Sequence, residues 1–86
     1  MEISQEKAIK ILHENCSLDW ELSLYRDHII VALPVAEGDF RTTYLNVKKQ
    51  ITKCIDEHFP DRNEELLFEI RNGSWNCGFK IKQAIG

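Results

Sequence analysis

Residues 69–79, EIRNGSWNCGF, place an Asn-Gly pair between two runs in which large apolar residues alternate with polar ones. Asn and Gly are the residues that best tolerate the positive φ required at both central positions of a type I′ turn. The pair Asn72-Gly73 therefore predicts a tight β-hairpin. This turn sets a register whose inward pairs are Ile70–Trp75, Phe68–Cys77 and Leu66–Phe79, and whose outward pairs are Arg71–Ser74, Glu69–Asn76 and Glu65–Lys80.

A second hairpin is predicted within residues 18–35. The stretch LDWELSLY alternates apolar with polar residues at a period of two, which a pleated strand sorts onto its two faces. The stretch IIVALPV follows and is rich in β-branched residues, which favour strands. A turn at Arg26-Asp27 puts every large apolar residue on one face, in the pairs Leu24–Ile29, Leu22–Val31, Trp20–Leu33 and Leu18–Val35.

Each predicted hairpin is preceded by a predicted helix. The first runs from Gln5 to about Cys16, with Ser4 as its N-cap. Its apolar residues recur at intervals of three and four, so they share one helical face. This face consists of Ala8, Ile9, Leu12 and Cys16.

The second helix is predicted from about Thr43, a plausible cap, to His58, and Pro60 ends it. Its apolar stripe faces the core, and charged residues at intervals of four face solvent. The acidic connector that follows, residues 59–65, carries turn residues and little to bury. The stripe consists of Tyr44, Val47, Ile51, Ile55 and His58, with Cys54 at its edge.

These elements predict an α+β domain with the order α-β-β-α-β-β. The simplest assembly pairs the two hairpins into a four-stranded antiparallel sheet and lays both helices on one face of it. The opposite face meets water. Residues expected on the helix-covered face are Trp20, Leu22, Val31, Phe68, Trp75 and Phe79.

The composition and length of the chain indicate which broad class of protein it belongs to. The chain has 86 residues, 43% hydrophobic and 29% charged, which is the usage of one soluble globular domain spanning residues 1–86. Its three cysteines do not make a paired disulfide framework. The N-terminal stretch lacks the long apolar core of a signal peptide, and the longest apolar run, residues 29–36, is too short to span a bilayer. We therefore expect a cytoplasmic protein with reduced thiols and no membrane association.

A nucleic-acid-binding surface is one alternative. The candidate residues lie on or next to the second helix, where cations could contact phosphates. The net charge of −3 and the carboxylates that follow these cations favour a solvated helix surface instead, with Lys53 and Glu57 paired at i, i+4. The candidates are Arg41, Lys48, Lys49 and Lys53.

A zinc site is a further alternative, because two His/Cys pairs lie on single helical faces and could supply four ligands. The pairs are His13 with Cys16 and Cys54 with His58. The commoner interpretation is that the cysteines are small buried apolar residues, so no metal and no cofactor is predicted. The chain also lacks the phosphate-loop, nucleophile-elbow and His-Glu-x-x-His motifs, and we expect no enzymatic activity.

A protein-binding role remains, and one feature favours it. In the predicted registers the outward face of the sheet is more apolar than a purely solvated face needs to be. A small acidic domain of this kind is typical of an adaptor, an inhibitor or an immunity-type protein, with a protein partner or a second copy of the chain bound at the sheet. The predicted partner-binding residues are Tyr25, His28, Ile30 and Leu67.

Overall fold

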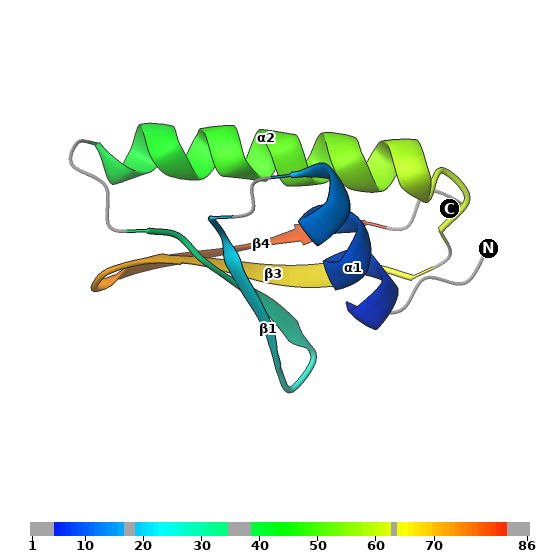
Figure 1. The fold of residues 1–86 in the computed structure, drawn as a ribbon, viewed down its shortest axis with the longest axis horizontal. Coiled ribbons are helices and arrows are strands. Elements are labelled where there is room, and N and C mark those ends of the chain that lie inside the picture. The colour runs from blue at the N-terminus through cyan, green and yellow to red at the C-terminus, as the bar shows by residue number, and fades with distance from the viewer. Residues whose placement is uncertain (1–4, 17–18, 35–38, 63, 83–86) are drawn as a thin grey trace.

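The computed structural model describes residues 5–16, 19–34, 39–62 and 64–82. The α+β class and the predicted order of elements are confirmed. One sheet with the strand order β1-β2-β3-β4 lies under α2, and α1 packs against α2 and β1 (Figure 1). In chain order the elements are α1 (Gln5–Asn15), β1 (Glu21–Tyr25), β2 (His28–Ala32), α2 (Phe40–His58), β3 (Leu66–Asn72) and β4 (Trp75–Ile81).

The sheet is mixed, whereas an entirely antiparallel sheet was expected. Each hairpin is antiparallel, but β2 and β3, which join the hairpins at the centre of the sheet, are parallel. The reason is the connection between them. α2 carries the chain back along the sheet, so β3 starts at the same end as β2, as a helical crossover between neighbouring parallel strands requires.

The register of the first hairpin is confirmed within its strands. Leu22 pairs with Val31 and Leu24 pairs with Ile29, across a turn at residues 26–27. The strands end before the predicted Trp20–Leu33 pair, although Trp20 is still buried. The predicted Leu18–Val35 pair lies outside the described residues, as does the predicted cap Ser4.

The turn of the second hairpin lies one residue further along than predicted. Gly73 has φ of 63° and Ser74 is not in the positive-φ region, the pattern of a type II′ turn, which needs Gly only at its first central position. The predicted pairs were therefore wrong by two residues, a shift that keeps every side chain on its predicted face. Burial favours the observed register because it pairs Leu66 with Ile81, and both are buried. The observed pairs are Asn72–Trp75, Ile70–Cys77, Phe68–Phe79 and Leu66–Ile81.

α2 begins earlier than the predicted cap at Thr43. Asp39 is the N-cap, and its carboxylate accepts hydrogen bonds from the Arg41 amide at 3.0 Å and the Thr42 hydroxyl at 3.1 Å. Aspartate satisfies the free amides of a first helical turn as well as a hydroxyl does. Within the ranges that the structure describes, no helix combines the length and the apolar character needed to cross a bilayer.

The core fills the space between the helices and one face of the sheet. Phe68, at its centre, is 1% exposed and stacks on Phe79 with ring centroids 5.1 Å apart. Trp75 was predicted to be in this core and is 66% exposed. It closes the hairpin next to the turn and stacks there on Phe40 at the start of α2, with centroids 5.9 Å apart. His58, predicted on the apolar stripe of α2, is also exposed, whereas Cys54 is buried.

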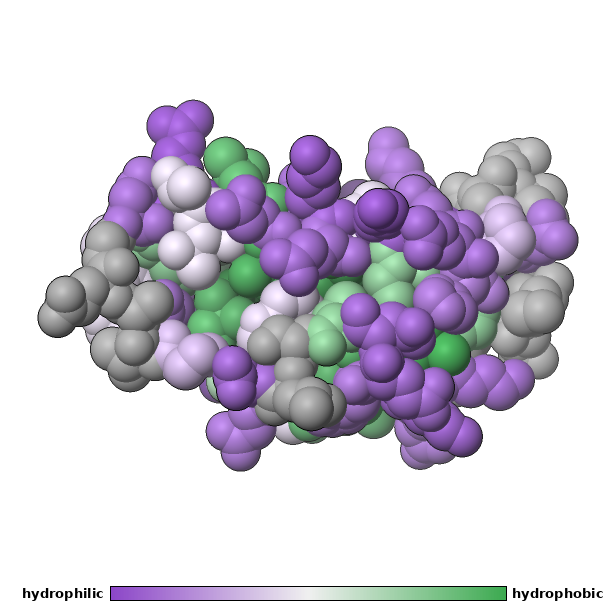
Figure 2. Space-filling view, turned by 45° about the horizontal axis from the view of Figure 1, so that its top comes forward, coloured by the Kyte–Doolittle hydropathy of each residue, from purple (hydrophilic) through white to green (hydrophobic). Residues whose placement is uncertain are grey.

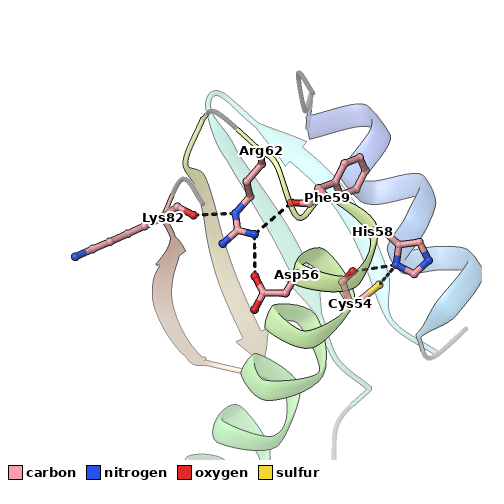
Figure 3. A network of polar contacts seen from close by, with 6 residues as sticks. All are labelled: Cys54, Asp56, His58, Phe59, Arg62 and Lys82. Carbon is pink, nitrogen blue, oxygen red and sulfur yellow. Dashed lines mark hydrogen bonds and ion pairs between the residues drawn. The ribbon is translucent and has the colours of Figure 1, made fainter. Parts of the chain in front are cut away.

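The connector after α2 buries more than was expected. Phe59 is 6% exposed and Arg62 is 7% exposed. The Arg62 guanidinium donates to the Lys82 carbonyl at 2.8 Å, the Asp56 carboxylate at 2.8 Å and the Phe59 carbonyl at 3.4 Å (Figure 3). One buried cation therefore joins the end of α2 to the residue that follows β4.

Candidate functional site

The candidate site is the face of the sheet turned away from the helices, here called the outward face. Residues aligned across neighbouring strands point to the same side, so the registers define its rows. All four predicted partner-binding residues stand on this face. One row is Tyr25, His28, Leu67 and Lys80, and the next is Ser23, Ile30, Glu69 and Gly78.

A hollow of about 620 Å³ on this face has Tyr25, His28 and Leu67 in its lining. Gly78 also lines it, and because Gly78 has no side chain, β4 leaves space beside Glu69, the residue aligned with it. A Cβ placed on Gly78 would be 3.4 Å from the Phe68 carbonyl oxygen, an ordinary van der Waals contact. The hollow therefore has room for an added side chain or for an incoming group of similar size.

The charges around the hollow do not cancel. Its lining contains three cations, Arg26, Arg71 and Lys80, and one carboxylate, Glu69. Arg71 Nη2 donates to Glu69 Oε2 at 3.0 Å. Lys80 Nζ lies 4.0 Å from Glu65 Oε2, but both side chains are more than half exposed, so water screens that pair. The hollow is thus locally positive on a chain whose net charge is −3.

The turn between β1 and β2 forms one wall of the hollow. Tyr25 is 58% exposed, and the Arg26 guanidinium lies 5.5 Å from the centroid of its ring. Arg26 has φ of 58°, a conformation that costs a residue other than glycine on the order of 1 kcal/mol or more. Contacts on either side hold the turn: Gln5 Nε2 of α1 donates to the Asp27 carbonyl at 2.7 Å, and His28 Nδ1 lies 3.0 Å from Asp27 Oδ1.

Ile30 lies on the outward face, as predicted, but it is only 5% exposed. Ile29 and Val31 beside it are fully buried on the helix-covered face, so the middle of β2 is covered on both sides. β2 is a central strand, with β1 and β3 on either side of it. Ile30 therefore contributes to the stability of the sheet and offers little contact surface.

Tyr44 supports the site from the helix-covered side, a role that the sequence pattern did not reveal. Its hydroxyl donates to the Gly78 carbonyl at 3.3 Å, and its ring lies edge-on to Phe79 with centroids 6.2 Å apart. Burial, together with the nearby Cys77, raises the pKa of Tyr44 to about 12, so the hydroxyl keeps its proton at neutral pH. α2 thereby holds β4 in place at the residue where the hollow opens.

The basic residues considered for nucleic-acid binding all belong to α2. Hydrophilic residues dominate the surface on the helix side of the molecule (Figure 2). Lys48, Lys49 and Lys53 come together around a second hollow of about 600 Å³, and Arg41 is not part of its lining. Asp56 and Glu57 line the same hollow, so its charge is mixed. Lys48 also reaches back over the Phe79 ring, with Nζ 5.6 Å from the centroid.

Three of the four residues considered for zinc lie together where the ends of α1 and α2 meet. Cys16, Cys54 and His58 line a hollow of about 260 Å³, whereas His13 is exposed outside it. His58 Nδ1 lies 2.9 Å from the Cys54 carbonyl and 3.8 Å from Cys54 Sγ (Figure 3). Among the described residues, no group of three or more His, Cys, Asp or Glu side chains is arranged to hold a metal ion.

Burial sets the ionisation of these thiols. It raises the pKa of Cys54 to about 12, and the neighbouring Cys16 and Glu57 act in the same direction. Burial also raises the pKa of Cys16, although a hydrogen bond with Cys54 partly offsets this. Both thiols are therefore protonated at neutral pH, which disfavours a thiolate nucleophile at this position.

Comparison of the chain with protein-family models, with curated proteins and with solved structures found no match.

Proposed function

We propose that this chain is a non-enzymatic protein-binding domain, of the adaptor, inhibitor or immunity type, and that the outward face of its sheet is the binding surface. The observation that supports the proposal is the hollow at Gly78, where an exposed aromatic ring, an aliphatic side chain and unbalanced positive charge meet. Interface centres are enriched in Tyr and Arg, and they need a concave place that an anchoring side chain can fill.

The chemistry of the lining indicates the kind of partner. Leu67 and the ring of Tyr25 offer apolar contact, while Arg26 and Lys80 stand on the same surface as cations. A segment with an apolar side chain beside carboxylates satisfies both, because the cations steer an acidic partner and the apolar group gains by leaving water. We therefore propose an acidic protein segment as the occupant of the hollow.

Selection from a random peptide display library on the immobilised protein tests this proposal. The expected result is enrichment of peptides in which an apolar residue is flanked by Asp or Glu. The selected peptides should lose at least tenfold in affinity for Gly78→Val. The Val side chain occupies the hollow, and a β-branched residue is well tolerated in a strand, so the fold should be retained.

Asn76→Val is the matched control. Asn76 lies on the same strand and the same face as Gly78, aligned with Arg71, but it does not line the hollow. This variant should bind the selected peptides as the wild type does. Peptides that bind Gly78→Val with unchanged affinity, or a selection that enriches no peptide, would show that the hollow is not a binding site. If sedimentation reveals a dimer that Gly78→Val abolishes, the occupant is a second copy of the chain and the acidic-segment proposal is wrong.

A further inference from the structure

The thiols of Cys16 and Cys54 form a pair that the proposed binding role does not use. Cys16 follows α1, and its amide donates to the Leu12 carbonyl at 2.9 Å, which continues the helical hydrogen bonding by one residue. Cys54 lies in the C-terminal half of α2 and is 5% exposed. Both side chains line one hollow and are close enough to shift each other's pKa, although 37 residues separate them in the sequence.

One hollow gives access to both thiols. Cys16 is half-buried, and both thiols line the hollow of about 260 Å³ at the ends of the two helices. Lys53 and Glu57 both line this hollow, so one cation and one carboxylate lie beside the two thiols. The third cysteine, Cys77, lies on β4 and takes no part in this lining.

We propose that Cys16 and Cys54 are a dithiol site that exchanges with small-molecule disulfides such as glutathione disulfide and closes to an intramolecular disulfide. Cys16, the more accessible thiol, attacks one sulfur of the incoming disulfide, so that a Cys16–glutathione bond forms and one glutathione leaves. Cys54 then attacks the Cys16 sulfur, the protein disulfide forms, and the second glutathione leaves. The protons of the two protein thiols end on the two glutathione thiolates; the protein loses two electrons and the incoming disulfide gains them.

Burial slows the proposed exchange. The reaction needs the thiolate of Cys16, whose pKa is raised, so exchange should accelerate with increasing pH. Once Cys16 carries glutathione, the second step is intramolecular, because Cys54 lines the same hollow. This step needs the Cys54 thiolate, whose pKa is raised to about 12, so it also accelerates with increasing pH. At alkaline pH the mixed disulfide should therefore convert to the internal disulfide in the wild-type protein. The closed disulfide ties α1 to α2 and should raise the melting temperature relative to that of the reduced protein.

The test is incubation of the full chain with glutathione disulfide at alkaline pH, where the thiolates form, followed by intact mass spectrometry and peptide mapping under non-reducing conditions. The wild type should lose the mass of two hydrogen atoms, and the map should join the peptides that contain Cys16 and Cys54. Cys54→Ser should instead retain glutathione on Cys16, because the resolving thiol is absent. Cys77→Ser is the matched control and should react as the wild type does.

Two results would overturn the proposal. One is a wild-type protein that accumulates glutathione on Cys16 without forming the internal disulfide, since the thiols would then not be placed to react. The other is a disulfide that joins Cys77 to either partner. Both readouts come from the wild-type chain, so they do not depend on whether a variant folds. The site is independent of the outward face, and neither result bears on binding there.

Discussion

At the scale of single residues, two backbone positions with positive φ set the two hairpins. Gly73 adopts φ of 63° without strain, because glycine has no Cβ, while Arg26 adopts 58° at a cost. The sequence correctly predicted the second hairpin but placed its turn one residue too early. Asn72-Gly73 fits a type I′ turn, whereas Gly73-Ser74 fits the type II′ turn that is observed. A local dipeptide signal thus predicts that a hairpin exists more reliably than it predicts its register.

Gly73→Val should lower the free energy of unfolding by about 1–3 kcal/mol, because a β-branched residue resists the φ that this position requires. No atom lies within 4 Å of a Cβ placed on Gly73, so the loss measures the backbone alone. Chemical denaturation provides the measurement. Ser74→Val, at the other central position, is the control and should lose less, because Ser74 is not in the positive-φ region. Equal losses in the two variants would mean that φ is not the cause.

The Cys54 thiol should make the free energy of unfolding fall at alkaline pH. A thiol is neutral when protonated, and its pKa rises from an ordinary 9.0 to about 12 on folding, so the folded state holds this proton more tightly than the unfolded chain does. Its contribution to stability is therefore complete below pH 9.0 and is lost progressively as the pH rises from there to about 12. Urea unfolding across this range should show a shallower alkaline loss for Cys54→Ala than for the wild type. The same slope in both proteins would refute this assignment.

At the scale of helices and strands, the connections between elements determine the relative strand directions, which the apolar periodicities do not specify. Apolar spacing predicted both helices and all four strands, but it could not show whether the hairpins meet antiparallel or parallel. α2, which is 19 residues long, returns the chain to the starting end of β2 and so makes β2 and β3 parallel. The buried Arg62 was missed for a similar reason, because it lies between the end of α2 and the residue after β4, which are brought together only by the fold.

Arg62 joins the end of α2 to the residue after β4, so replacing it should weaken the contact between these two segments. Arg62→Met keeps most of the apolar stem and removes three hydrogen bonds, and it should lower the free energy of unfolding by about 2–4 kcal/mol. Asp56→Asn is the control, with an effect below about 1 kcal/mol, because the Asp56 side chain is 55% exposed and water can replace it. Equal effects would show that the ion pair with Asp56, rather than the hydrogen bonds to backbone carbonyls, accounts for the stabilisation by Arg62. Thermal denaturation of the three proteins measures the difference.

The two faces of β3 should respond differently to charge. Phe68→Asp should unfold the domain, because it puts a carboxylate in the centre of the core. Leu67→Asp, one residue away on the outward face, should change the free energy of unfolding by less than about 1 kcal/mol, since Lys80 is aligned with it. Circular dichroism of the variants checks both outcomes. Ile30→Asp should resemble Phe68→Asp, because Ile30 is buried; retention of the fold would contradict its burial.

At the scale of the whole molecule, one face of the sheet carries the helices and the other carries the candidate site. The sequence predicted this division and three of the residues that line the hollow, because alternation along a strand sorts side chains onto faces wherever the strand lies in the sheet. It did not predict the hollow itself. The hollow depends on the alignment of Gly78 with Glu69 and on Tyr44 behind β4, and both follow from a register that only the assembled sheet reveals.

The most direct test of the proposed function is a heteronuclear NMR titration of the wild-type chain with a display-selected acidic peptide. Binding at the outward face predicts amide shift changes that are largest at Tyr25, Leu67 and Gly78 and that are absent in Gly78→Val. The exposed side of α2, at Lys49 and Lys53, should remain unchanged. Shift changes concentrated at Lys49 and Lys53, with Gly78 unaffected, would contradict the account and place binding on the helix surface instead.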